Sequence, residues 1–241
     1  MIGLGTIINS GGIVLGGIFG LLFGKLLKER HQESLCKACG ISVMFIAIAG
    51  AMEKMLAIEK GGLTSGKAML VTACLTLGTL IGELINIEGL FERFGEWLKR
   101  KTGNSGDNNF VTGFMNASFT VSIGAMAIMG AIQDGISGDW SILATKSILD
   151  LIIVMVMTGS MGVGCIFSAI PVFAFQGAIT LLAVFIKPYM TELAVSHISL
   201  VGSILIFCVG VNLVWGKKVR VANMIPAVLL AVAAAFLPIS W

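Results

Sequence analysis

Charged residues are scarce in this chain, and their scarcity decides the class of protein. Only 12% of the 241 residues are charged and 56% are hydrophobic, whereas about a quarter of the residues are charged in a typical soluble domain. So few charges cannot cover the surface of a water-soluble globule. A soluble enzyme, a nucleic-acid-binding protein and a disordered protein are therefore excluded. The sequence predicts an integral membrane protein whose partner is the lipid bilayer.

Groups typical of catalysis or metal binding are also few. His31 and His197 stand near the ends of apolar segments, with no nucleophile or carboxylate arranged around them. Cys36 and Cys39 form a CxxC pair, but a zinc site needs two further ligands, which the sequence does not supply nearby. There is no Walker-type phosphate loop in the sequence. We therefore expect no enzyme, no cofactor, no metal site and no ATP-driven transport.

Long uncharged runs make up most of the chain, and about 20 apolar residues span a bilayer as a helix. The run over 151–186 is too long for one span and contains Gly159, Gly162 and Gly164, so we expect a break there. The predicted fold class is all-α, a polytopic helical membrane protein of about eight transmembrane helices. The predicted spans cover 2–24, 38–52, 68–82, 110–132, about 140–158, about 162–186, 198–216 and 221–241.

The basic residues predict the orientation. With the N-terminus outside, eleven of the 16 Lys and Arg residues fall in inner loops, and Lys54, Lys60, Lys67 and Lys187 fall in outer loops. The remaining one, Lys146, lies inside a span. The positive-inside rule therefore predicts that both termini lie outside the cytoplasm.

Residues 87–100 predict an amphipathic helix between the third and fourth spans. Its apolar side carries Leu90, Phe91, Phe94, Trp97 and Leu98, and its other side is charged. Such a helix lies along the inner leaflet surface, or it packs on the protein as a cytoplasmic lid. Both interpretations stay open at this point.

An internal repeat is predicted within a single membrane domain over 1–241. Residues 3–37 placed over 162–196 align Asn9 with Ser168 and Gly17 with Gln176. Repeat one covers 1–87 and repeat two covers 162–241; the amphipathic helix and loop at 88–109 and two central spans at 110–158 lie between them. This order gives the repeats opposite orientations, as in many secondary transporters. The alternative is two unrelated helical triplets that share only their hydrophobicity.

Glycines recur every four residues along one face of the first span, at Gly12, Gly16, Gly20 and Gly24. This spacing removes side chains from one ridge, so another helix can approach closely. The partner is either another helix of this chain or a second copy in a homo-oligomer.

Two ionisable residues stand inside the fifth span. Lys146 and Asp150 are four residues apart, so they lie on one helix face and are close enough to pair. Ionisable groups within a span are costly and usually face a polar cavity or a partner. We interpret the pair as a substrate-binding or ion-coupling site. The alternative is a structural ion pair that joins two helices.

Further polar residues accompany this pair. The small-residue run at 124–130 permits a bend at mid-membrane, where free backbone groups would line a cavity. Ser118 and Ser122 serve equally well as contacts between helices. The remaining candidates for binding a solute or ion are Asn9, Asn116, Thr120, Gln133, Asp134, Ser147 and Gln176.

These features together predict an ion-coupled secondary transporter of a small polar or charged solute, with H⁺ or Na⁺ as the coupling ion. Asp150, Lys146, Gln133 and Asp134 would form its charged centre. A channel or pore is the first alternative, and a structural or sensory membrane protein is the second.

Three stretches resemble the signature sequences of a known bacterial family. They are GAMAIMGAIQDG at 124–135, TKSILD at 145–150 and FSAIP at 167–171. The chain is similar over essentially its whole length to the uncharacterised YdfK/YqgA-type membrane proteins, domain of unknown function 554. Thr120-Val-Ser122 departs from the Phe-Cys-Val of many members, which would alter a polar lining. The resemblance implies a multi-pass inner-membrane protein and no particular substrate.

Overall fold

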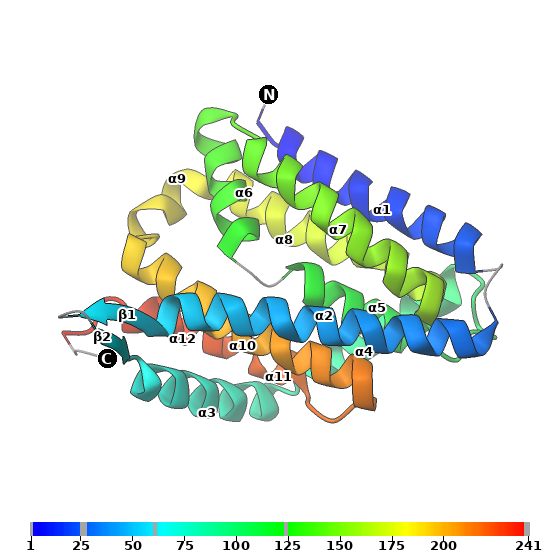
Figure 1. The fold of residues 1–241 in the computed structure, drawn as a ribbon. Helices are drawn as coiled ribbons and strands as arrows, with labels where there is room; N and C mark the ends of the chain where they lie inside the picture. The colour runs from blue at the N-terminus through cyan, green and yellow to red at the C-terminus, as the bar shows by residue number, and fades with distance from the viewer. Residues whose placement is uncertain (1, 25–27, 60–61, 123–124, 239–241) are drawn as a thin grey trace.

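The chain folds into two layers of helices joined by a bent helix pair. The computed structural model describes residues 2–24, 28–59, 62–122 and 125–238. Figure 1 shows α1, α7 and α8 side by side in one layer and α2, α3, α10 and α12 in the other. The helices are α1 Leu4–Gly24, α2 Glu29–Met55, α3 Ala68–Ile85, α4 Ile87–Lys101, α5 Phe110–Ser122, α6 Ala125–Ser137, α7 Ser141–Met161, α8 Ala169–Leu181, α9 Ala183–Ile186, α10 Glu192–Trp215, α11 Val221–Met224 and α12 Pro226–Ala234, with 3₁₀ turns η1 Val163–Ser168 and η2 Lys187–Tyr189.

The predicted all-α fold class is confirmed, with one small addition. Strands β1 Leu56–Glu59 and β2 Gly62–Ser65 form an antiparallel hairpin between α2 and α3. Leu56 pairs with Ser65, and Glu59 pairs with Gly62. The sequence predicts only a loop here, because a four-residue strand is too short to give a recognisable pattern.

Five helices in the described part of the chain are long and apolar enough to cross a membrane. They are α1, α3, α7, the η1–α8 segment and α10, and a sixth span results if α5 and α6 count as one. Residues 221–234 form a shorter apolar helix. The structure thus contains five or six candidate spans by length and composition, and the count of eight stays a prediction.

Both predicted breaks in the apolar runs are present. Helix α7 ends at Met161, and Gly162 has φ = 90°, a left-handed conformation that other residues rarely adopt. The axes of α5 and α6 differ by 62°. Gly124, at which the predicted mid-membrane bend begins, lies outside the described residues.

Glycines set how the helices pack. A Cβ on Gly12, Gly16 or Gly20 would collide with Ser147, Leu151 or Met155 respectively, in equal steps of four residues along each helix. Helices α1 and α7 are therefore parallel and in backbone contact. The partner of this glycine face, left open above, is a helix of the same chain.

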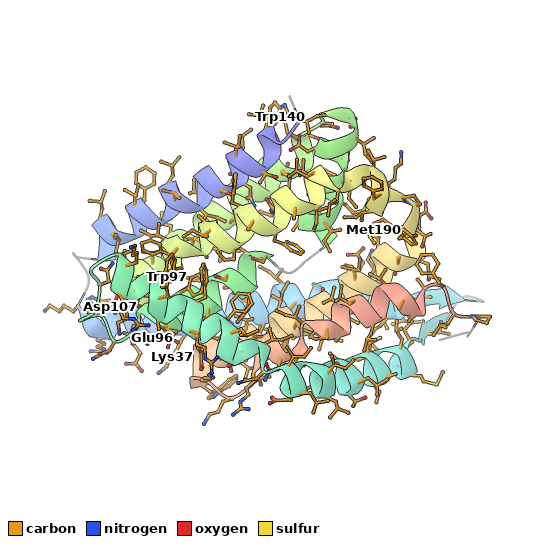
Figure 2. The ribbon with its side chains drawn as sticks, turned by 180° about the vertical axis from the view of Figure 1, so that it is seen from behind. Lys37, Glu96, Trp97, Asp107, Trp140 and Met190 are labelled. Atoms are coloured by element: carbon orange, nitrogen blue, oxygen red, sulfur yellow. The ribbon has the colours of Figure 1, made fainter. Side chains whose placement is uncertain are left out.

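The amphipathic helix is confirmed as α4, and it packs on α5. The ring of Phe91 lies 5.0 Å from that of Phe119, and Phe94 lies 5.8 Å from Phe114. Leu98 is buried, whereas Trp97 is half exposed. Figure 2 places Trp97 and Trp140 towards different ends of the helices, a pattern typical of membrane–water interfaces.

Candidate functional site

The predicted ion pair is present and buried at the middle of α7. The ammonium nitrogen of Lys146 lies 2.5 Å and 2.7 Å from the two carboxylate oxygens of Asp150. Only 7% of Lys146 and 3% of Asp150 is exposed. Asp150 is the tenth of the 21 residues of α7, so the pair stands far from both ends of the helix. Charges at this depth in a bilayer are costly and are usually functional.

The break between α5 and α6 supplies a third group to this pair. Lys146 Nζ donates a hydrogen bond of 2.8 Å to the carbonyl oxygen of Val121. In an unbroken helix this carbonyl would accept from the amide four residues later. Because α5 ends at Ser122, the carbonyl belongs to the last turn, where such acceptors need other partners. The bend and the ion pair therefore form one unit.

Two amide side chains extend the polar cluster. The Asn9 Nδ2 group of α1 donates to Gln176 Oε1 of α8 at 3.2 Å, and both residues are completely buried. Asn9 lies one helical turn before Gly12, whose close contact with Ser147 sets α1 against the helix that carries the ion pair. We call Lys146, Asp150, Asn9, Gln176 and the Val121 carbonyl the central polar cluster.

Several buried polar atoms of the described residues lack a hydrogen-bond partner. Asn9 Oδ1 and Gln176 Nε2 belong to this cluster, and Ser10 Oγ, Ser118 Oγ and Ser122 Oγ lie on α1 and α5. Each buried unpaired polar atom costs about 1–3 kcal/mol. Such atoms are candidates for contact with water, an ion or a polar solute. Ser118 and Ser122 therefore make no hydrogen bond between described helices, although they were considered for that role.

Two other predicted residues make structural contacts instead. Ser147 Oγ donates to the carbonyl oxygen of Ile8 at 3.0 Å and so joins α7 to α1. Thr120 Oγ1 donates to the carbonyl oxygen of Asn116 within α5, at 2.8 Å. The Asn116 side chain lines a separate cavity, described below.

The structure does not bring Gln133 and Asp134 to the ion pair. Asp134 is fully buried and accepts hydrogen bonds from the amides of Gly3 and Gly5 at 3.2 Å and 3.0 Å. Gln133 donates to Asp139 at 2.8 Å. The predicted four-residue charged centre is therefore reduced to Lys146 and Asp150. Sequence reasoning missed this because the bend directs α6 away from the pair.

Replacing Asp134 with alanine is expected to lower the free energy of unfolding by about 1–2 kcal/mol. Its carboxylate satisfies free amides at the start of α1, a helix that carries no acidic residue in its own first turn. Thermal unfolding of the purified protein in detergent measures the loss. Glu53→Ala is the control, because Glu53 is exposed, pairs with the neighbouring Lys54 and bonds no amide at the start of a described helix. An equal loss in the control would contradict this capping role.

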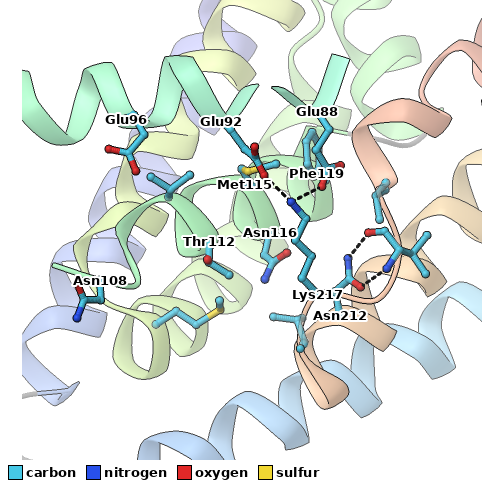
Figure 3. Close-up of a pocket in the computed structure, with 16 residues that line it drawn as sticks. Glu88, Glu92, Glu96, Asn108, Thr112, Met115, Asn116, Phe119, Asn212 and Lys217 are labelled. Carbon is cyan, nitrogen blue, oxygen red and sulfur yellow. Dashed lines mark hydrogen bonds and ion pairs between the residues drawn. The ribbon is translucent and has the colours of Figure 1, made fainter. Parts of the chain in front are cut away.

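A cavity of about 500 Å³ opens between α4, α5 and the segment after α10. Figure 3 shows Glu88, Glu92 and Glu96 of α4 above it and Lys217 reaching up from below. Lys217 Nζ lies 2.9 Å from Glu88 and also pairs with Glu92. The sequence predicts a charged helix face for these glutamates and a loop for Lys217, and no local pattern connects them.

No group of three His, Cys, Asp or Glu residues suited to a metal ion occurs in the described ranges. The side chains of Cys36 and Cys39 lie outside the described residues, so the prediction made for them is not tested.

The chain is similar over nearly its whole length to two known proteins, one of which is named as a membrane protein. The chain is 30% identical over 226 residues to the uncharacterized membrane protein YdfK of Bacillus subtilis, with 94% of this chain and 93% of YdfK covered. It is 28% identical over 232 residues to the uncharacterized protein YqgA of Escherichia coli, with 95% and 94% covered. No solved structure matches. The model of the family described as "Protein of unknown function (DUF554)" matches residues 4–236, so the chain belongs to that family.

Proposed function

We propose that this membrane protein is an ion-coupled secondary transporter of a small polar or charged solute. The observation that carries the proposal is the Lys146–Asp150 pair, which is buried halfway along α7 and bonded to the Val121 carbonyl at a helix break. Discontinuous helices that present backbone groups at mid-membrane are typical of transporter binding sites. In this proposal H⁺ or Na⁺ acts at Asp150, and no catalytic reaction is involved.

The inverted repeat that we propose for this chain is a second argument for the same function. Each helix of the first triplet packs against its expected counterpart: α1 on α8, α2 on α10 and α3 on α12. Asn9 contacts Gln176 while Gly17 contacts Ile166, so α1 and α8 run in opposite directions. Gly78 and Gly82 face Ala227 and Asn223 in the same antiparallel manner. Antiparallel counterparts are the arrangement that a two-fold axis in the membrane plane requires.

The proposed membrane is the bacterial cytoplasmic membrane, with both termini outside. The first turn of α1 and the segment after α12 lie at the same end of the molecule. The Gly5 amide of α1 donates a hydrogen bond to Asp134 of α6, and α6 packs on α9. Tyr189, which follows α9, contacts Phe236, which follows α12. The opposite end carries the basic residues Arg93, Lys99, Arg100, Lys101, Lys217, Lys218 and Arg220. This asymmetry favours that end as cytoplasmic.

The substitution Asp150→Asn tests the proposal. Proteoliposomes on a solid-supported membrane would receive amino acids, amines and inorganic cations under an H⁺ or Na⁺ gradient. We expect wild-type protein to give solute-evoked currents and Asp150→Asn to give none, because an amide can neither take up and release a proton at neutral pH nor supply the negative charge that attracts Na⁺. Thermal unfolding in detergent serves as the folding control. Full currents in the folded variant would refute the assignment.

The same measurement separates the alternatives. A channel would carry a steady current driven by its permeant ion alone, without a coupled solute. A structural or sensory protein would give no current in the wild type under any gradient.

A further inference from the structure

The cavity between α4, α5 and the segment after α10 has the size of a small-molecule site. Its volume of about 500 Å³ lies within the usual range for ligand pockets of roughly 300–1,000 Å³. We call it the α4–α5 cavity. The central polar cluster is separate, since none of its five groups lines the cavity.

Negative charge predominates on its walls. Glu88, Glu92 and Glu96 recur every four residues and therefore project from one face of α4. Lys217 is the only cationic residue among the described lining residues. Glu96 is exposed and forms no ion pair with any described residue. The lining therefore carries an unbalanced carboxylate charge.

An unpaired amide faces the same space. Asn116 is only 9% exposed, and its side chain makes no hydrogen bond within the described part of the chain. Figure 3 shows this side chain pointing into the space between Thr112, Lys217 and Asn212. In its neighbour Asn212, by contrast, both ends of the side-chain amide are hydrogen-bonded. The nitrogen donates to the carbonyl of Val219, and the oxygen accepts from the amides of Lys218 and Val219. The amide group of Asn116 is open to the cavity, so it is available to bond water or a polar ligand there.

Lys217 shows which kind of chemical group these carboxylates bind. Its ammonium lies between Glu88 and Glu92, while half of its side chain is exposed. Partial burial lowers the pKa of Lys217, but the hydrogen bonds and charges of Glu92 and Glu88 outweigh this effect and raise the pKa above its usual value. The group therefore stays an ammonium at neutral pH. It is a primary ammonium on a flexible aliphatic chain.

We propose that the α4–α5 cavity binds a linear aliphatic diamine or polyamine, and that the Lys217 ammonium occupies one of its charge positions when the ligand is absent. Residues four apart on a helix are separated by ~6 Å along its axis, which a short methylene chain between two ammonium groups can bridge. One ammonium would displace Lys217 at Glu88 and Glu92, a second would reach Glu96, and the Asn116 oxygen would accept a hydrogen bond. The role of the cavity as a substrate site rests on the proposed transport function, whereas the binding of a polyamine there does not.

Isothermal titration calorimetry of the full chain in a neutral detergent tests the proposal, with spermidine and putrescine as probes. Glu92→Gln and Glu96→Gln should each weaken spermidine binding about tenfold, because each loses one charge-assisted contact. Lys217→Met should tighten binding by at least about threefold, because it removes the tethered competitor. Glu33→Gln is the matched control, since Glu33 also pairs with a lysine but is exposed on α2, away from the cavity.

The outcomes are distinct. Saturable binding that Glu92→Gln and Glu96→Gln weaken and Glu33→Gln does not would support the site. Absence of spermidine binding would overturn the site, and so would a loss of spermidine affinity in Glu33→Gln equal to that in Glu92→Gln and Glu96→Gln. A cavity that binds Mg²⁺ but no polyamine, with Mg²⁺ binding abolished by Glu92→Gln, would also overturn it. Asp150→Asn should retain wild-type spermidine affinity. Polyamine binding with unaltered currents in Asp150→Asn would therefore contradict only the transport proposal, whereas loss of currents without polyamine binding would contradict only this one.

Discussion

Replacing Lys146 alone with methionine is expected to lower the free energy of unfolding by about 3–5 kcal/mol, because it leaves a buried carboxylate without its partner. Asp150 is 3% exposed, and Lys146 supplies both of its short ion-pair contacts. The same substitution also removes the donor to the Val121 carbonyl at the helix break. SDS-induced unfolding of the purified protein, followed by circular dichroism, measures the loss.

The double substitution Lys146→Met/Asp150→Leu is the control for this prediction. It removes both charges and fills their space with apolar side chains, so most of the stability lost in the single variant should return. A further loss in the double variant, as large as that in the single, would show that the two side chains act independently. The recovery matters because it provides a folded protein without the pair.

Replacing Gly16 with leucine is expected to disrupt the α1–α7 contact and to cost about 3 kcal/mol or more. A Cβ at this position would lie 2.9 Å from both the carbonyl carbon and the Cα of Leu151. These are backbone atoms of α7, so they cannot move aside as a flexible side chain would. The contact also holds α1, which carries Asn9, against the helix that carries Lys146 and Asp150. Thermal unfolding in detergent measures the effect.

Gly11→Leu is the matched control for the Gly16 substitution. Gly11 lies on the same helix, but an added Cβ there would have no atom within 4 Å. Its melting temperature should stay close to that of the wild type. Leucine is a better helix former than glycine, so helix propensity cannot lower the stability of either variant. If both leucine variants unfold at the same temperature, the predicted clash of residue 16 with the α7 backbone is contradicted.

Local signals in the sequence predicted the elements around the candidate site well. Trp140 directly precedes α7, the glycines after Met157 end it, and the spacing of Lys146 and Asp150 gives the observed pair. These features depend on residues within one or two helical turns of each other. The glycine face of α1 likewise predicted close packing, and only its partner was open.

Contacts between distant segments could not be predicted in the same way. Asp134 was assigned to the charged centre, yet it binds the amides of Gly3 and Gly5. Its environment follows from the direction that α6 takes after the bend, and composition does not specify that direction. The α4–α5 cavity was missed for a related reason. Lys217 and Glu88 are 129 positions apart in the numbering, and only the packing of α4 beside the segment after α10 brings them together.

Solute-evoked current through the Lys146→Met/Asp150→Leu variant is the most direct test of the central claim. The variant should unfold at nearly the same SDS concentration as the wild type, so its function can be judged in a folded protein. If the buried pair couples ion and solute movement, proteoliposomes of this variant will give no current with any solute that drives wild-type protein. Currents equal to those of the wild type would contradict the account and leave the pair as a structural contact between helices.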